Sequence, residues 1–281
     1  MYLMRRIFRC ICCIFLIFVL FFPTAVSCAQ NPLAARLELR EVARYPHDVE
    51  AFTQGLFYEA GFLYESTGEY KFSTLRQVEI KTGKVIRKVR LPDKYFAEGM
   101  HIIGNKIYQL TWQAGYCFIY DKSTLKMIGQ FQYKGEGWGL TGDGKYLIMS
   151  NGSDQLNFIE PSNFKSVRKI SVKDVDAKTK KSFPLRNLNE LEYINGEIWA
   201  NIWQSTQIAR INPVTGEVIG RIEFSAFVPT ENRNELSLRW GERRSVLNGI
   251  AFDPQNKRIY ITGKNWKIIY EFEIVSDVLQ K

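Results

Sequence analysis

The chain has 281 residues, of which 46% are hydrophobic and 14% aromatic, and its formal net charge is +9. Beyond residue 28 the net charge falls to +6, because the first 28 residues hold three arginines and no acid. The other basic residues are spread along the chain, which argues against nucleic acid as a partner. The two histidines, His47 and His101, and the single cysteine beyond residue 28, Cys117, nearly exclude a zinc site and a disulfide framework.

The N-terminus has the layout of a secretory signal peptide. A basic head with three arginines precedes an apolar run, Cys10–Phe22, which ends at Pro23 and is followed by small residues. The run is shorter than the roughly 20 residues that span a membrane, which disfavours the alternative of an uncleaved anchor. The sequence therefore predicts a signal peptide over residues 1–28 and an exported protein, periplasmic or extracellular.

The end of this segment allows a second interpretation. Ala25-Val26-Ser27-Cys28 loosely resembles the lipid-attachment box of bacterial lipoproteins, in which Cys28 would carry lipid. The mature protein would then be tethered to a membrane, and a membrane is expected as a partner only in that case. Cleavage after small residues explains the same stretch without lipid.

Beyond residue 28 the sequence shows short alternating segments separated by turn residues, with no long helical period. An apolar strand, a turn and a second strand recur five times, and the first four copies are followed by a second hairpin with a clear turn. Four strands per repeat, at a period of roughly 40 to 60 residues, indicate a β-propeller. The sequence thus predicts an all-β, five-bladed β-propeller over residues 29–281, as one catalytic domain. The copies begin at Gly55, Gly99, Trp138, Leu191 and Gly249.

Ring closure and two insertions complete this prediction. The fifth repeat lacks an outer strand, which Leu37–Val42 is expected to supply, so that no sheet edge stays exposed. Lys173–Asn187 and Phe224–Val246 interrupt the repeat, and we expect both to form loops or short helices on one face, where binding residues concentrate. An ordinary β-sandwich is the alternative, but it does not predict the repeat.

The innermost strands of a propeller converge on one axis, so the loops that enter them share one mouth. In this chain those loops, and the ends of the strands that follow, are rich in aromatic, amide and carboxylate side chains. We therefore expect these residues to approach one pocket. They are Phe52, Gln54, Phe96, Glu98, Glu136, Trp138, Asn189 and Asn248 in the loops, with Trp112, Asn151, Trp203 and Lys264 at the strand ends.

The expected pocket offers no histidine, cysteine or activated serine, which argues against a serine triad and a catalytic thiolate. A carboxylate that carries protons is the remaining simple acid–base option, and tryptophan walls would raise its pKa by desolvation. Plainer interpretations also exist, because tryptophans are often core residues and Glu98 could cap a turn. Glu65 is expected to stabilise a turn as an acceptor, and Glu190 and Glu192 to have structural roles.

Six short motifs follow one another in a fixed order along the chain. They are Phe52-Thr53-Gln54-Gly55-Leu56, Glu65-Ser66-Thr67-Gly68, Phe96-Ala97-Glu98-Gly99, Gly137-Trp138-Gly139-Leu140, Leu188-Asn189-Glu190-Leu191-Glu192-Tyr193 and Leu247-Asn248-Gly249-Ile250-Ala251. Together with Thr262-Gly263-Lys264 and Trp266, they resemble the plant and bacterial glutaminyl-peptide cyclotransferases, of which the papaya latex enzyme is typical. The resemblance covers about residues 40–275, and it is carried by the shared order of the motifs, since no single motif is decisive.

The resemblance implies a five-bladed propeller that converts N-terminal glutamine of peptides and proteins to pyroglutamate and releases ammonia. It implies that Glu98 is the catalytic carboxylate and that Asn189 or Lys264 polarises the amide oxygen. It implies no cofactor and no catalytic metal, and we expect a monomer whose partners are peptides or proteins with N-terminal glutamine. It places further substrate contacts at Phe52, Gln54, Phe96, Trp112, Trp138 and Trp203. One departure is Asn151, where the family pattern often has aspartate.

Two other functions stay open at this point. A secreted propeller without activity could bind peptides or glycans through the same mouth. A metal-dependent propeller lactonase would need several inward carboxylates and asparagines around an ion, which Glu98, Asn189 and Asn248 could supply. Release of ammonia from a glutamine peptide, with and without a chelator, separates these alternatives.

Overall fold

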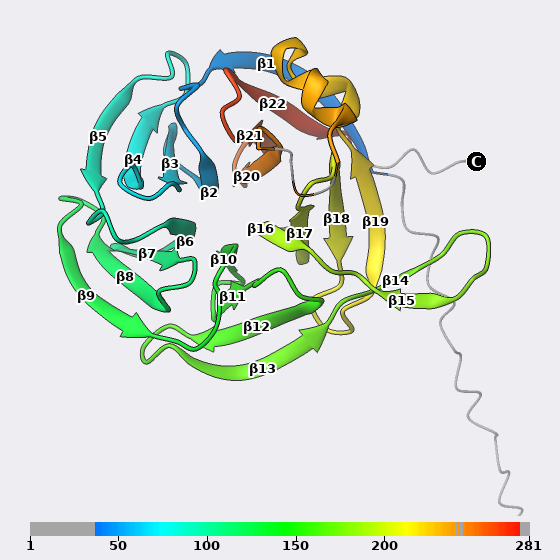
Figure 1. The fold of residues 1–281 in the computed structure, drawn as a ribbon, viewed down its shortest axis with the longest axis horizontal. Helices are drawn as coiled ribbons and strands as arrows, with labels where there is room; N and C mark the ends of the chain where they lie inside the picture. The colour runs from blue at the N-terminus through cyan, green and yellow to red at the C-terminus, as the bar shows by residue number, and fades with distance from the viewer. Residues whose placement is uncertain (1–36, 240, 242–243, 276–281) are drawn as a thin grey trace, which may run out of the picture. The chain divides into compact units, whose positions relative to one another are not determined.

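Five four-stranded antiparallel sheets follow one another along the chain in a computed structural model that describes residues 37–239, 241 and 244–275. The sheets are arranged as the blades of a ring, and the innermost strand of each blade contacts that of the next (Figure 1). The predicted five-bladed propeller is confirmed. The predicted signal peptide and Cys28 lie outside the described residues. Among the described residues, no helix has the length and apolar character needed to cross a membrane.

Each of the first four blades begins with its innermost strand and ends with its outermost. Blade one contains β2 (Thr53–Glu59), β3 (Phe62–Thr67), β4 (Thr74–Glu79) and β5 (Val85–Arg90), and blade two contains β6 (Ala97–Ile103), β7 (Lys106–Thr111), β8 (Tyr116–Asp121) and β9 (Met127–Gln132). Blade three contains β10 (Leu140–Gly142), β11 (Leu147–Met149), β12 (Gln155–Glu160) and β13 (Lys165–Ser171). Blade four contains β16 (Leu188–Ile194), β17 (Glu197–Ile202), β18 (Gln207–Ile211) and β19 (Val218–Glu223). Blade five contains β20 (Leu247–Asp253), β21 (Arg258–Gly263) and β22 (Ile268–Val275).

The outermost strand of blade five comes from the N-terminal side of the chain. β1 (Glu38–Pro46) pairs antiparallel with β22, with Tyr45 opposite Ile269 and Glu38 opposite Val275. The prediction that Leu37–Val42 closes the ring is confirmed, and the strand extends four residues further, to Pro46. This pairing covers the edge of β22, which would otherwise present unpaired backbone groups to other chains.

Apolar side chains pack between neighbouring blades, and among the described residues there is one such cluster at each of the five interfaces. Leu75 of blade one and Phe118 of blade two belong to one cluster, and Trp199 of blade four and Trp266 of blade five belong to another. These four side chains are at most 2% exposed. Burial of a large apolar side chain contributes about 1.5–3 kcal/mol, so these clusters hold neighbouring blades together.

Close backbone approach and buried carboxyl groups fill the axis. A Cβ atom on Gly99 would lie 2.4 Å from the backbone nitrogen of Leu140, so only glycine fits there. Glu190 of β16 reaches past the axis and accepts backbone N–H bonds from Leu56 of β2, at 3.2 Å, and Ile250 of β20, at 2.9 Å. Glu192 accepts one from β20 in the same way. Both glutamates have the structural role that the sequence indicates.

The two insertions differ from each other. Lys173–Asn187 contains a hairpin of β14 (Lys173–Val175) and β15 (Ser182–Pro184), which extends beside β19 at the outside of the ring (Figure 1). The prediction of a loop or short helix on the binding face is therefore wrong for this insertion. Asp174 of this hairpin pairs with Arg221 of β19 at 2.5 Å, which holds it beside the outermost strand of blade four. Phe224–Val246 contains two 3-10 helices, η1 (Ser225–Phe227) and η2 (Thr230–Ser237), as expected.

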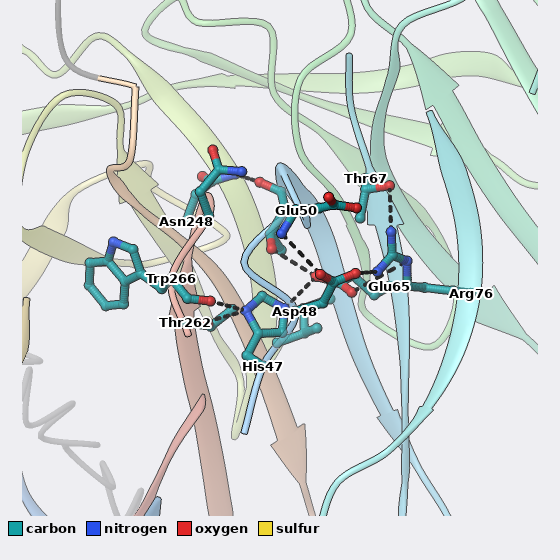
Figure 2. A network of polar contacts seen from close by, with 12 residues as sticks. His47, Asp48, Glu50, Glu65, Thr67, Arg76, Asn248, Thr262 and Trp266 are labelled. Atoms are coloured by element: carbon teal, nitrogen blue, oxygen red, sulfur yellow. Dashed lines mark hydrogen bonds and ion pairs between the residues drawn. The ribbon is translucent and has the colours of Figure 1, made fainter. Parts of the chain in front are cut away.

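A buried polar network ties blade five to blade one next to the closing strand, as Figure 2 shows. His47 follows β1, and its Nδ1 lies 2.7 Å from the carbonyl oxygen of Trp266 while its Nε2 lies 2.9 Å from Oε1 of Glu65. Both partners are acceptors, so the imidazole donates from both nitrogens and is protonated. Burial lowers the pKa of His47, but the charge and hydrogen bond of Glu65 outweigh it and raise that pKa above its ordinary value.

Glu65 has a different role from the predicted one. It lies in β3 with its side chain 1% exposed, and it accepts a hydrogen bond from the Thr53 hydroxyl at 2.7 Å. Arg76 lies 3.8 Å away on its other side, and its guanidinium also pairs with Asp48 at 2.8 Å. The expectation that Glu65 supports a turn is wrong, because the carboxylate is a buried ion-pair partner at the junction of two blades.

Candidate functional site

The predicted site residues lie at one end of the five innermost strands or in the loops beside that end. Gln54 and Glu98 are the second residues of β2 and β6, and Asn189 is the second residue of β16. In an antiparallel blade the end of the second strand lies next to the start of the first. Trp112, Trp203 and Lys264 directly follow β7, β17 and β21, and so reach the same end of the ring.

A buried polar chain connects blades five, one and two at this end. Asn248 donates from Nδ2 to Oε1 of Gln54 at 3.2 Å, and Gln54 donates from Nε2 to Oε1 of Glu98 at 3.1 Å. Glu98 is 5% exposed and Lys264 is 4% exposed. The Lys264 ammonium lies over the ring of Phe52, 4.6 Å from its centre. A carboxyl group and an amine thus share a largely dry environment, where their charges act strongly on each other.

Burial shifts the proton affinities of this pair. Desolvation raises the pKa of Glu98 well above its ordinary value, Lys264 opposes this shift, and the nearby Glu136 carboxylate adds to it. Desolvation also lowers the pKa of Lys264 to about 8, against the attraction of Glu98. A carboxylate with a raised pKa is a stronger base than an exposed one, which suits it to take up and return a proton during a reaction.

Half-buried aromatic rings surround the polar chain. Phe96 makes edge-on contacts with Phe52, at 6.1 Å between ring centres, and with Trp112, at 5.7 Å. Trp138 and Trp203 meet edge-on at 5.5 Å. All five rings keep part of their surface accessible. By contrast, the core tryptophans Trp199 and Trp266 are at most 1% exposed. The five rings of the site therefore form an accessible wall and are not part of the core.

Glu136 joins the two halves of this wall. Its Oε2 accepts the indole N–H of Trp112 at 2.8 Å and that of Trp138 at 2.9 Å. Its Oε1 accepts Nε2 of Gln113 at 3.1 Å. The sequence places Glu136 in the loop before blade three but gives it no role. The signal that could have found it is a carboxylate two residues before a tryptophan at the mouth.

Two predicted residues take less obvious positions. The backbone carbonyl of Asn189 accepts the Ser150 hydroxyl at 2.7 Å, while its buried Oδ1 atom has no hydrogen-bond partner. Buried polar atoms in folded proteins are almost always paired, so this orphaned acceptor oxygen suits a hydrogen-bond donor on a bound molecule. Asn151 is exposed and accepts hydrogen bonds from Ser153 within its own turn. Its side-chain oxygen therefore caps that turn.

The propeller also contains a cavity away from the site residues. A cavity of about 610 Å³ lies at the other end of the innermost strands and is lined by residues such as Tyr58, His101, Tyr193 and Phe252. None of the nine predicted site residues lines it. His101 is buried there, and desolvation lowers its pKa to about 4, so the imidazole is neutral. The chemistry described above belongs to the opposite end.

A basic carboxyl group beneath an aromatic wall, in a five-bladed ring, defines the class of protein as a propeller enzyme with an acid–base site. Comparison with known proteins narrows this class. The family model described as glutamine cyclotransferase matches residues 14–274. A glutaminyl-peptide cyclotransferase of Arabidopsis thaliana is 39% identical over 240 residues, which cover 84% of this chain and 71% of that protein. The chain belongs to the glutamine cyclotransferase family.

A solved structure agrees with this assignment. The crystal structure of Myxococcus xanthus glutaminyl cyclase is similar to this chain with a TM-score of 0.74 and 36% sequence identity. The match covers 86% of this chain and 99% of that one. The expected family and the expected fold are thus both confirmed.

Proposed function

We propose that this end of the propeller converts N-terminal glutamine of peptides and proteins to pyroglutamate and releases ammonia, with Glu98 as the proton carrier. The observation that carries this assignment is the buried Glu98 carboxyl group, whose pKa desolvation raises, held by Gln54 beneath the aromatic wall. Family membership gives the reaction, and the burial and contacts of Glu98 support its assignment as the proton carrier. The reaction forms a bond between the α-nitrogen and the side-chain amide carbon of the same residue, and breaks the bond from that carbon to the amide nitrogen.

Protons balance around Glu98 in this scheme. Its carboxylate takes a proton from the attacking amine and gives a proton to the departing nitrogen, which leaves as ammonia. Negative charge develops on the amide oxygen in between, and the Lys264 ammonium or the Asn189 amide stabilises it. With a pKa of about 8, Lys264 is mostly protonated at pH 7 and can act as that donor.

The aromatic wall contributes positioning. Ring closure requires the substrate chain to bend so that its amine meets its own amide carbon, and holding reacting groups at contact distance supplies much of the rate in such reactions. Phe52, Phe96 and Trp112 form one group of contacting rings, and Trp138 and Trp203 form a second. We assign these rings to holding the bent substrate and excluding water from Glu98.

The first experiment follows ammonia release from a peptide that begins with glutamine. Wild-type protein should release one ammonia per peptide, with an equal rate in the presence of a chelator. Glu98→Gln should fold normally and lose a factor of about 10² to 10⁴ in turnover, the usual contribution of a general acid–base group. Absence of ammonia release would favour a binding propeller, loss of activity with chelator would favour a metal-dependent enzyme, and near wild-type turnover of Glu98→Gln would remove Glu98 from its role.

A further inference from the structure

Glu136 is a half-buried carboxylate that the reaction scheme does not use. It lies between β9 and β10, and the carboxylate binds side chains from two blades: Trp112 and Gln113 follow β7, and Trp138 precedes β10. An indole N–H can only donate and an ionised carboxylate can only accept, so these bonds have a single polarity. One carboxylate oxygen therefore fixes two tryptophans relative to each other.

The hydrogen bonds also keep Glu136 ionised. Partial burial raises its pKa, but the donors Trp138, Gln113 and Trp112 together outweigh this and hold the pKa below its ordinary value. Hydrogen bonds to a charged acceptor are shorter and stronger than neutral ones, and both indole bonds here are shorter than 3.0 Å. At neutral pH a negative charge thus stands at the centre of the aromatic wall.

Each tryptophan that Glu136 holds makes a further contact in the wall. Trp112 packs against Phe96, which immediately precedes β6, the strand of Glu98, and Trp138 packs against Trp203. The carboxylate is therefore the polar link between the two groups of rings. A shift of Glu136 would change the separation of the two groups and not only one ring.

We propose that Glu136 is a positioning residue, which sets the separation of Trp112 and Trp138 and places a fixed negative charge near Glu98. This proposal rests on the proposed function. The groups that act electrostatically on Glu98 are Lys264, which follows β21, and Glu136 itself. Tyr133, which follows β9, is also coupled to Glu98 but stays neutral, because burial raises its pKa. When the Glu136 charge is lost, no negative charge counters the effect of Lys264 on Glu98, and the pKa of Glu98 falls.

Two substitutions separate the position of Glu136 from its charge. Glu136→Gln removes the charge, and its amide offers one acceptor oxygen where the carboxylate offers two. We expect kcat/KM to fall on the order of 100-fold, the effect of misplacing reacting groups by about 1 Å. The acid limb of the kcat/KM profile should also move to lower pH, because the pKa of Glu98 falls. Glu136→Asp keeps the charge on a shorter arm, so kcat/KM should fall while the acid limb stays in place.

The control is a carboxylate with the same chemistry outside the site. Glu197 accepts the indole N–H of Trp199 at 3.3 Å and pairs with Arg210 in blade four. Glu197→Gln should leave kcat/KM and its pH profile unchanged. Thermal unfolding of all variants reports whether they fold, and if Glu136→Gln does not fold, Glu136→Asp decides the positioning role.

The outcomes are distinct from those that test the proposed function. If wild-type protein releases no ammonia, the proposed function fails first. If wild-type protein is active and both Glu136 variants keep kcat/KM within twofold, the positioning role is refuted while the function stands. If the variants lose thermal stability but keep the wild-type rate and acid limb, Glu136 only links two blades and the proposal is wrong. A lower kcat/KM in both variants, together with an acid limb that moves only in Glu136→Gln, supports the proposal.

Discussion

At the scale of single residues, the site places an acid and a base in one dry environment and shifts their pKa values toward each other. Glu98 and Lys264 are both nearly fully buried, and each moderates the shift that burial imposes on the other. The rate of a reaction that needs the Glu98 carboxylate and the Lys264 ammonium must therefore depend on pH in both directions.

We expect a bell-shaped dependence of kcat/KM on pH. The acid limb should lie well above pH 4.5, because Glu98 must lose its proton, and the alkaline limb should lie near the pKa of Lys264, about 8. Lys264→Met removes the charge that favours ionised Glu98, so the acid limb should move to higher pH and the alkaline limb should disappear. The rate should fall about 10² to 10³-fold, as on loss of an oxyanion donor.

A lysine three residues away provides the control for this measurement. Lys267 is exposed and pairs with Glu231 at 3.0 Å, so Lys267→Met should keep the wild-type profile. The α-amine of the substrate also titrates near pH 8, but it does so equally for every variant, so differences between profiles belong to the enzyme. Identical acid limbs in Lys264→Met and wild-type protein would contradict the coupling of Lys264 to Glu98.

The common location of Gln54, Glu98 and Asn248 at one end of the ring could be predicted from the sequence, because they occupy equivalent places in a repeat. Gln54, Glu98 and Asn248 each precede a glycine at the start of an innermost strand, and the repeat alone brings those starts together. The shared bond of Glu136 to Trp112 and Trp138 could not be predicted, because it depends on side-chain directions in two blades. A sequence pattern gives the place of a residue in its repeat, but not its partner in the next one.

At the scale of elements, local signals succeed where a strand pair closes on itself. Asn195 and Gly196 both have positive φ and connect Ile194 to its partner Glu197, which is the tight turn that an Asn-Gly pair favours. The hairpin of β14 and β15 was missed because its turn region, with Lys178, Lys180 and Lys181, shows charge without alternation. Its place is fixed by pairing with blade four, which no local signal contains.

The junction of blades five and one depends on His47 and Glu65, and we expect its stability to depend on that ion pair. His47→Gln leaves the Glu65 carboxylate buried, with the Thr53 hydroxyl at 2.7 Å and the charge of Arg76 no closer than 3.8 Å. Removal of one partner of a buried pair typically costs about 3–5 kcal/mol of unfolding free energy. Denaturant unfolding of both single variants and of the double variant with Glu65→Gln measures the coupling.

The pH dependence of this junction has a definite sign. The pKa of His47 is raised in the folded protein, so its contribution is complete below about pH 6.5 and is lost as the pH rises through the folded value. The pKa of Glu65 is lowered by His47 and Arg76 against burial, so its contribution is lost on acidification below its ordinary range. Single variants that each lose as much as the double variant support the pair, and strictly additive losses would exclude the coupling.

At the scale of the whole molecule, the two ends of the axis have separate roles. One end gathers the acid–base groups, while Glu190 and Glu192, further along β16, join the innermost strands by hydrogen bonds. Gln54, Glu98 and Asn248 are each followed by a glycine, whereas Asn189, at the equivalent place in blade four, is followed by Glu190. Where blades one, two and five have a glycine that allows close backbone contact, blade four therefore has a carboxyl group. Its hydrogen bonds to blades one and five hold the centre of the ring together.

This central carboxyl pair predicts that the protein is less stable in alkali. Desolvation raises the pKa of Glu192 to about 8, against hydrogen bonds from Thr141 and Phe252, and the pKa of Glu190 is raised well above its ordinary value by burial and by Glu192. Between about pH 4.5 and 8 the folded state therefore holds a proton that the unfolded state has lost. The unfolding free energy should fall by up to ~1.4 kcal/mol per pH unit for one such group.

Glu192→Gln tests this prediction, because its amide is close in shape to the protonated carboxyl group but cannot ionise. The variant should match wild-type protein near pH 5 and exceed its unfolding free energy at pH 9, as measured by denaturant unfolding across that range. Glu217→Gln, at an exposed position, should follow the wild-type curve. His47 also destabilises the protein as pH rises, but it does so in all three proteins, so the difference between curves isolates Glu192. Parallel curves for Glu192→Gln and wild-type protein from pH 5 to pH 9 would show that Glu192 does not stay protonated in the folded state over this range.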